Sequence, residues 1–159
     1  VHMYSVEYMY GDPHLIRFLA YLSLFTFFML VLVTGANGIV FFIGWEGIGL
    51  CSYLLINFWY TRSAANKAAM KALIINKIGD VCVLLAFIFL FRLYLSLDFL
   101  LINCTSWLIQ KSIYLNMYIF WINIDYITII LFLLIVGVCA KSAQIGLHTW
   151  LPDAMEGPT

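Results

Sequence analysis

Charged residues are scarce in this sequence, and their scarcity excludes an ordinary soluble domain. Only 10% of the 159 residues are charged, whereas hydrophobic types make up 65%. Soluble domains are roughly half apolar and a quarter charged. Neither sign of charge dominates, because 8 basic residues face 8 acidic ones. The composition therefore indicates a lipid environment and gives no sign of a nucleic-acid surface or an acidic substrate.

Recognisable cofactor motifs are also missing. No CxxC spacing occurs among the cysteines, which predicts neither a disulfide nor a metal site, and these are Cys51, Cys82, Cys104 and Cys139. A glycine fingerprint for dinucleotides after a strand is absent as well. We expect no flavin, iron–sulfur or quinone site in this chain. The opening "VHMYSVEYMYGDPH" lacks the features of a signal peptide, and we expect the chain to be part of a longer protein.

Long hydrophobic runs are what the sequence has in abundance. A membrane-spanning helix needs about twenty mostly apolar residues, because its backbone amides must bond within the segment. We predict an all-α, polytopic transmembrane helix bundle that forms a single membrane domain over residues 1–159. Its predicted spans are 15–34, 39–60, 73–95 and 125–149. The alanine-rich 61–72 is expected to be a surface helix, and 96–124 an interfacial segment, because its apolar pieces are too short to cross.

Basic residues indicate the orientation of these spans, since Lys and Arg gather on the side from which a chain is inserted. The predicted topology brings four of them to one face, namely Arg17, Arg62, Lys67 and Lys71, and two to the other, namely Arg92 and Lys111. The start of the chain is therefore expected on the matrix or cytoplasmic side. The residues after Lys141 are expected to return to that side.

Glu46 is the most conspicuous charge within a predicted span. It lies about 14 Å along a helix from Asn37, close to the middle of a ~30 Å hydrocarbon core, where an ionised side chain costs about 2.5–3.5 kcal/mol. Gly44, Gly47 and Gly49 around it would let a neighbouring helix approach closely. A functional carboxylate is one interpretation, and a buried glutamate that only joins two helices is the other.

Lys77 and Asp80 form a second intramembrane group. They are three residues apart, so they can pair along one face of a helix, and pairing removes much of the cost of burial. An internal ion pair that only anchors the helix explains them about as well as a functional role does.

Lys141 follows the uncharged run Tyr126 to Ala140. Gln144 and His148 would share its face if the helix continued, giving a row of amine, amide and imidazole. Gly146 and Pro152 interrupt the helix, and broken membrane helices occur where backbone lines a cavity or is buried in protein. The alternatives are a lysine that snorkels at a helix end and a histidine at the membrane boundary.

Three stretches of the sequence resemble a known family: "FFIGWEGIGLCSYLLINFWYTR", "AANKAAMKALIINKIGD" and "AKSAQIGLHTWLPDAMEGPT". In this order and spacing they are similar to the subunit 5 family of mitochondrial NADH:ubiquinone oxidoreductase, respiratory complex I, and its bacterial antiporter-like counterpart. The resemblance implies four spans of an antiporter-like inverted-repeat fold whose last helix is broken. It also implies that Glu46 and Lys141 drive one proton channel and that Asp80 matches a family aspartate. Lys77 stands where an arginine is usual, which loses the planar two-pronged donor.

The function that the resemblance implies is that of a proton-translocating membrane-arm subunit of complex I, part of a proton-translocating NADH:ubiquinone reductase. NADH, FMN, iron–sulfur clusters and ubiquinone would be bound by other subunits. Expected partners are the other membrane-arm subunits, a second fragment carrying the rest of the same subunit, and the lipid bilayer. The expected location is the mitochondrial inner membrane, with the bacterial plasma membrane as the alternative. Two other functions stay open: a subunit of a multi-subunit sodium/proton antiporter, and a structural scaffold without a channel of its own.

A mechanism follows as a hypothesis from the residues. Burial disfavours the charged form of a lysine, whereas a nearby carboxylate favours it. Lys141 would then be the switch and Glu46 its modulator, with Gln144, His148 and internal water conducting protons to the basic side of the membrane.

Overall fold

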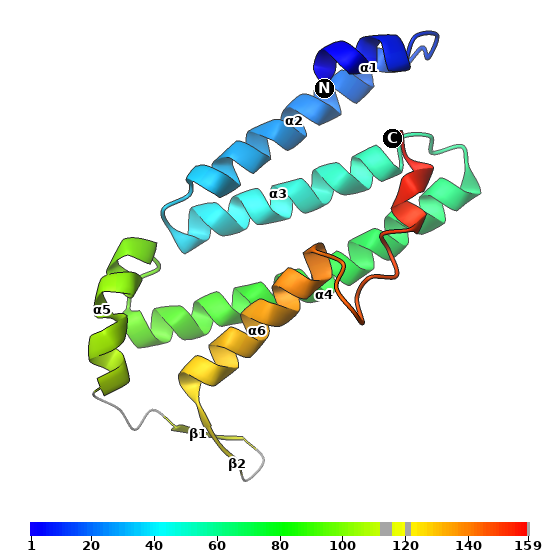
Figure 1. The fold of residues 1–159 in the computed structure, drawn as a ribbon. Coiled ribbons are helices and arrows are strands. Elements are labelled where there is room, and N and C mark those ends of the chain that lie inside the picture. The colour runs from blue at the N-terminus through cyan, green and yellow to red at the C-terminus, as the bar shows by residue number, and fades with distance from the viewer. Residues whose placement is uncertain (112–115, 120–121, 159) are drawn as a thin grey trace.

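Three long apolar helices dominate the computed structural model, which describes residues 1–111, 116–119 and 122–158 (Figure 1). They are α2 (Leu15–Thr34), α3 (Gly38–Ile56) and α4 (Ser63–Tyr94), and each is long and apolar enough to cross a membrane. A short helix α1 (His2–Tyr8) precedes them. The predicted transmembrane helix bundle is confirmed.

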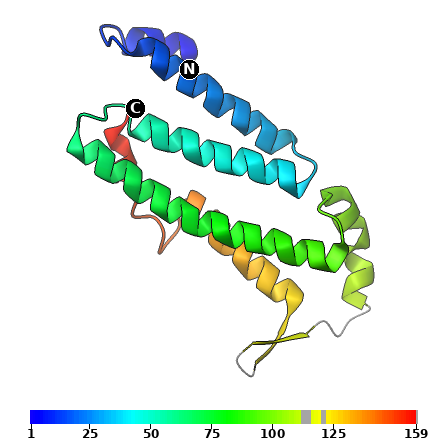
Figure 2. The ribbon, with the colours of Figure 1, turned by 180° about the vertical axis from the view of Figure 1, so that it is seen from behind.

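The α2–α3 pair is an antiparallel hairpin of helices, as both ribbon views show (Figures 1 and 2). Asn37 caps α3 by accepting a 2.9 Å hydrogen bond from the backbone amide of Ile39. The two helices approach closely at Gly44, where an added Cβ would lie 2.6 Å from the backbone nitrogen of Leu32, and at Gly47, which faces the Phe28 ring. The interpretation that glycines near Glu46 permit a close neighbour is confirmed at these two positions.

Helix α4 is continuous through residues where the sequence predicted a boundary. We expected a surface helix at 61–72 and a separate span at 73–95, but the structure has one helix from Ser63 to Tyr94. Alanine is the strongest helix former, and no proline or glycine separates the two parts before Gly79. The alanines also pack in a buried cluster, with Ala68, Ala69 and Ala72 against Ile56 of α3. Nothing therefore interrupts the helix.

The predicted interfacial segment 96–124 contains regular structure. Helix α5 (Phe99–Lys111) is followed by a hairpin of two antiparallel strands, β1 (Asn116–Ile119) and β2 (Ile122–Asp125), with Ile119 opposite Ile122. The hairpin is the one departure from helical structure among the described elements, and residues 112–115 and 120–121 lie outside the description. Both α5 and the hairpin lie at one end of the bundle (Figure 1).

Helix α6 (Tyr126–Lys141) packs against α4 and is shorter than the predicted span 125–149. Its 16 residues end at Lys141, after which Ala143 and Gly146 adopt left-handed backbone conformations with φ of 51° and 99°. A 3-10 turn, η1 (Asp153–Glu156), closes the described chain and packs on α4 and α3. The predicted break in the last helix is thus confirmed, and the end of the fourth span is corrected from residue 149 to Lys141.

The carbonyl groups at the end of α6 find partners other than a further helical turn. The backbone amide of Gln144 donates to the Cys139 carbonyl at 3.0 Å, and the indole of Trp150 donates to the Ala140 carbonyl at 3.0 Å. Because a helix end leaves its last carbonyls without intrahelical donors, these bonds allow the helix to stop there. The returning segment lies beside the start of α4, where Asp153 pairs with Lys71 at 2.7 Å.

Candidate functional site

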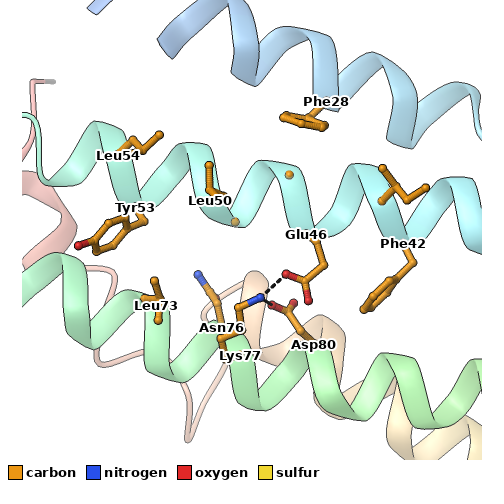
Figure 3. Close-up of a pocket in the computed structure, with 13 residues that line it drawn as sticks. Phe28, Phe42, Glu46, Leu50, Tyr53, Leu54, Leu73, Asn76, Lys77 and Asp80 are labelled. Atoms are coloured by element: carbon orange, nitrogen blue, oxygen red, sulfur yellow. Dashed lines mark hydrogen bonds and ion pairs between the residues drawn. The ribbon is translucent and has the colours of Figure 1, made fainter.

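A row of charged side chains joins α3 and α4. Glu46 of α3 forms an ion pair with Lys77 of α4, and the Lys77 ammonium also lies 3.7 Å from the Asp80 carboxylate on its own helix (Figure 3). The Asp80 side chain is only 4% exposed, whereas the Lys77 side chain is 53% exposed. The predicted Lys77–Asp80 pair is therefore present, and Lys77 joins it to Glu46.

Trp45 extends this row to α6. Its indole nitrogen donates to Asp80 at 2.7 Å, and its backbone carbonyl accepts a hydrogen bond from the Lys141 ammonium. The same ammonium lies 4.4 Å from the centre of the Trp45 ring, within cation–π range. The order of contacts is thus Glu46, Lys77, Asp80, Trp45, Lys141.

Trp45 was not among the residues that the sequence singled out, because those were chosen for their charge within a predicted span or for the polar row that they would form with Lys141. The sequence feature that could have identified Trp45 is its position in the middle of a predicted span. A tryptophan in the middle of a span has an indole N–H that lipid cannot satisfy, so it needs a polar partner within the protein.

Lys141 is the last residue of α6, and its ammonium faces α3. In the part of the chain that the structure describes, it forms no direct ion pair with a carboxylate. Glu46, the carboxylate that the resemblance assigns to it, is paired with Lys77 instead. A Cβ added at Gly49 would lie 3.6 Å from the Lys141 ammonium, so the amine occupies space beside the bare glycine backbone.

Gln144 and His148 do not continue a helical row from Lys141. The helix ends at Lys141, and both residues are exposed in the irregular segment that follows it. The shared face was predicted by extending 3.6-residue periodicity past Lys141, which the break at Ala143 and Gly146 invalidates. Their role in proton transfer stays a prediction that this geometry does not support directly.

A cavity of about 620 Å³ adjoins the charged row between α2, α3 and α4 (Figure 3). Its polar wall consists of Glu46, Asn76, Lys77 and Asp80, and the rest of its lining is mostly apolar. The side-chain oxygen of Asn76 is buried without a hydrogen-bond partner. Because each water takes about 30 Å³, the cavity has room for water beside Glu46.

Outside the spans, Asp12 precedes α2 and contacts the turn that follows α3. It accepts hydrogen bonds from the His14 backbone amide at 2.9 Å and from the Trp59 indole at 3.0 Å. These bonds favour the ionised carboxylate, the His14 bond most, and hold the pKa of Asp12 below its ordinary value of 3.8. Among the described residues, no group of three or more His, Cys, Asp or Glu could hold a metal ion.

Comparisons with known proteins show the family to which the chain belongs. The model of the family described as NADH:quinone oxidoreductase/Mrp antiporter, TM, matches residues 35–159. The chain is 53% identical to NADH-ubiquinone oxidoreductase chain 5 of Acanthamoeba castellanii and 54% identical to that of Triticum aestivum. Both alignments cover 100% of this chain and 23% of the relative. The chain thus spans about a quarter of the length of these curated relatives.

Proposed function

Because this chain belongs to the transmembrane family of NADH:quinone oxidoreductases and Mrp antiporters, we propose that it forms part of a proton-translocating subunit in the membrane arm of respiratory complex I. The observation that carries the proposal is the row from Glu46 to Lys141, which ends on an amine at a helix break. Intramembrane ionisable residues that face protein rather than lipid mark ion pathways.

Lys141 has the chemistry of a proton switch. Its burial between α6 and α3 disfavours the charged form, whereas the Trp45 carbonyl and ring favour it. Because these effects oppose each other, a small change nearby alters the balance. A change of about 2.7 kcal/mol would alter the ratio of protonated to neutral amine about hundredfold.

Lys77 supplies a way to make that change. It contacts both Glu46 and Asp80 and is half-exposed, so it can favour one carboxylate over the other without leaving the site. When Lys77 moves toward Asp80, Glu46 is freed to act on Lys141, and when it returns, Glu46 is neutralised. We propose Glu46 as the modulator and Lys77 as the cation that controls it.

The route for the proton combines the cavity with the irregular segment after Lys141. The polar wall of the cavity includes Glu46, and the exposed segment after Lys141 holds Gln144 and His148. An imidazole ring can accept a proton and release it again, so it can relay protons in either direction. We propose that water joins Lys141 to these two side chains.

The redox chemistry of the complex would take place elsewhere. Flavin, iron–sulfur clusters, NADH and ubiquinone are assigned to other subunits, and this chain contributes proton transfer to the NADH:ubiquinone reductase. We propose as its partners the other membrane-arm subunits and a second fragment that carries the rest of the same subunit. We propose the mitochondrial inner membrane as the location, because the similar relatives are NADH-ubiquinone oxidoreductase subunits.

Replacement of Lys141 by alanine tests the proposal. Complex I assembled with Lys141→Ala and reconstituted in vesicles should oxidise NADH but move fewer protons per electron pair. Lys67→Ala is the matched control, because Lys67 is an exposed lysine outside the row. An unchanged proton yield in Lys141→Ala would refute the function proposed for this site.

A subunit of a multi-part sodium/proton antiporter is the second candidate, because the matched family includes Mrp antiporters. The two functions differ in the subunits that co-purify with the chain and in the ion that drives or follows transport. Co-purification with flavin and iron–sulfur subunits supports complex I, whereas sodium-driven proton movement without NADH supports the antiporter. The chain-long identity of 53% to an NADH-ubiquinone oxidoreductase chain favours the first.

A further inference from the structure

We infer that Trp45 is a positioning residue for the Lys141 amine, and that its indole couples this amine to Asp80. The inference rests on the proposed function, because it assigns Trp45 a part in the same proton switch. Different groups of Trp45 contact the two ionisable side chains: the backbone carbonyl and the ring face contact Lys141, and the indole nitrogen donates to Asp80.

The carbonyl of Trp45 can accept the amine although it lies within α3. A carbonyl oxygen has two lone pairs, so it can accept a second donor beside the helical bond from the residue four positions on. That residue is Gly49, whose lack of a side chain leaves the approach open to the Lys141 ammonium. Any residue larger than alanine at 49 would extend toward the amine.

The ring of Trp45 is held in one orientation. The 2.7 Å bond to Asp80 fixes one edge, and Phe41 stacks on the ring with 5.6 Å between centroids and 27° between planes. The Lys141 ammonium lies over a face of this ring, 4.4 Å from the ring centre. Because the ring quadrupole attracts a cation and not a neutral amine, this face favours protonated Lys141. Loss of the hydrogen bond to Asp80 would allow the ring to change its orientation. Asp80 therefore influences the protonation of Lys141 indirectly, through the ring.

Other charges also act on Lys141 and would remain in a Trp45 variant. They are Glu46 from α3 and Asp80 and Lys77 from α4. Trp45 therefore adds to the effect of these charges on the protonation of Lys141. This contribution should appear as a displacement of the pH dependence of pumping rather than as its abolition.

The test uses complex I assembled with Trp45→Leu, which removes the ring face and the indole donor. Proton yield per electron pair is measured in vesicles over a range of pH and normalised to assembled complex. Without the ring the protonated amine is less favoured, so the alkaline limb of the profile should move to lower pH by about one unit, a tenfold loss of proton affinity. Trp45→Phe keeps a ring but loses the bond to Asp80, and should give a smaller shift in the same direction.

Trp59→Phe is the matched control. It removes an equivalent indole–carboxylate hydrogen bond, to Asp12 at 3.0 Å, outside the row, and should leave the profile unchanged. A Trp45→Leu profile that coincides with the wild type would overturn the inference. If Trp45→Leu fails to assemble, the profile of Trp45→Phe decides in the same way. Lys141→Ala is measured alongside: full pumping there refutes the proposed function, whereas lost pumping there with unshifted Trp45 variants refutes only the role of Trp45.

Discussion

Gly79→Ala should displace Lys141 although it changes no charged residue. An added Cβ at position 79 would lie 2.5 Å from the Cβ of Ala140, the residue before Lys141. Carbon atoms in contact are about 3.5–4.0 Å apart, so α6 must move away from α4 by roughly 1 Å or more. Overpacking of this kind costs about 1–3 kcal/mol, against a gain of about 1 kcal/mol in helix propensity for alanine over glycine.

Proton yield per electron pair is the quantity to measure, together with the amount of assembled complex. A misplacement of about 1 Å can cost as much as hundredfold in rate, so pumping should fall more than assembly does. Ala140→Gly removes the clashing Cβ, and the double variant with Gly79→Ala should recover most of the loss. Gly38→Ala is the control, because its nearest atom would lie at an ordinary 3.5 Å. Normal pumping in Gly79→Ala, or no recovery in the double variant, would contradict the packing argument.

Three further changes have expected outcomes. Lys77→Met leaves the Glu46 carboxylate without its counterion, at a cost of up to about 2.5–3.5 kcal/mol. This variant should lower both the amount of assembled complex and the proton yield, whereas Lys77→Arg should preserve both. The pKa of Asp12 lies below 3.8 in the folded protein, so its hydrogen bonds stabilise the fold above that pH, and this stability is lost as the pH falls through the lowered pKa. Asp12→Asn should remove this acid-induced loss of stability, which an acid titration followed by tryptophan fluorescence measures. Trp150→Phe deprives the buried Ala140 carbonyl of its donor, costing about 1–3 kcal/mol, and should lower the temperature of thermal inactivation.

The sequence predicted the helices well where hydrophobicity and charge decide the structure. Apolar length located the spans that became α2 and α3, and the cost of an isolated charge in lipid drew attention to Glu46, Lys77, Asp80 and Lys141. All four belong to the row that the structure assembles. The i, i+3 spacing also predicted the Lys77–Asp80 contact, because neighbours on one helix need no tertiary information.

Contacts between helices could not be predicted in the same way. Periodicity within α3 says nothing about which helix lies opposite, so the pairing of Glu46 with Lys77 was not foreseen. The sequence predicted a break in the last helix but not its position, because the end of α6 at Lys141 depends on Trp150, which returns from beyond the break to donate to the Ala140 carbonyl. Periodicity was extended through that break to Gln144 and His148, and their predicted helical row was wrong for this reason.

Replacing Lys141 by arginine tests the central claim, that this amine gains and releases a proton during turnover, most directly. Arginine keeps the positive charge and can donate to the Trp45 carbonyl, but it does not lose its proton in proteins. Complex I with Lys141→Arg should assemble and oxidise NADH yet move fewer protons per electron pair than the wild type. A wild-type proton yield would show that a permanent charge suffices at this position and would contradict the account.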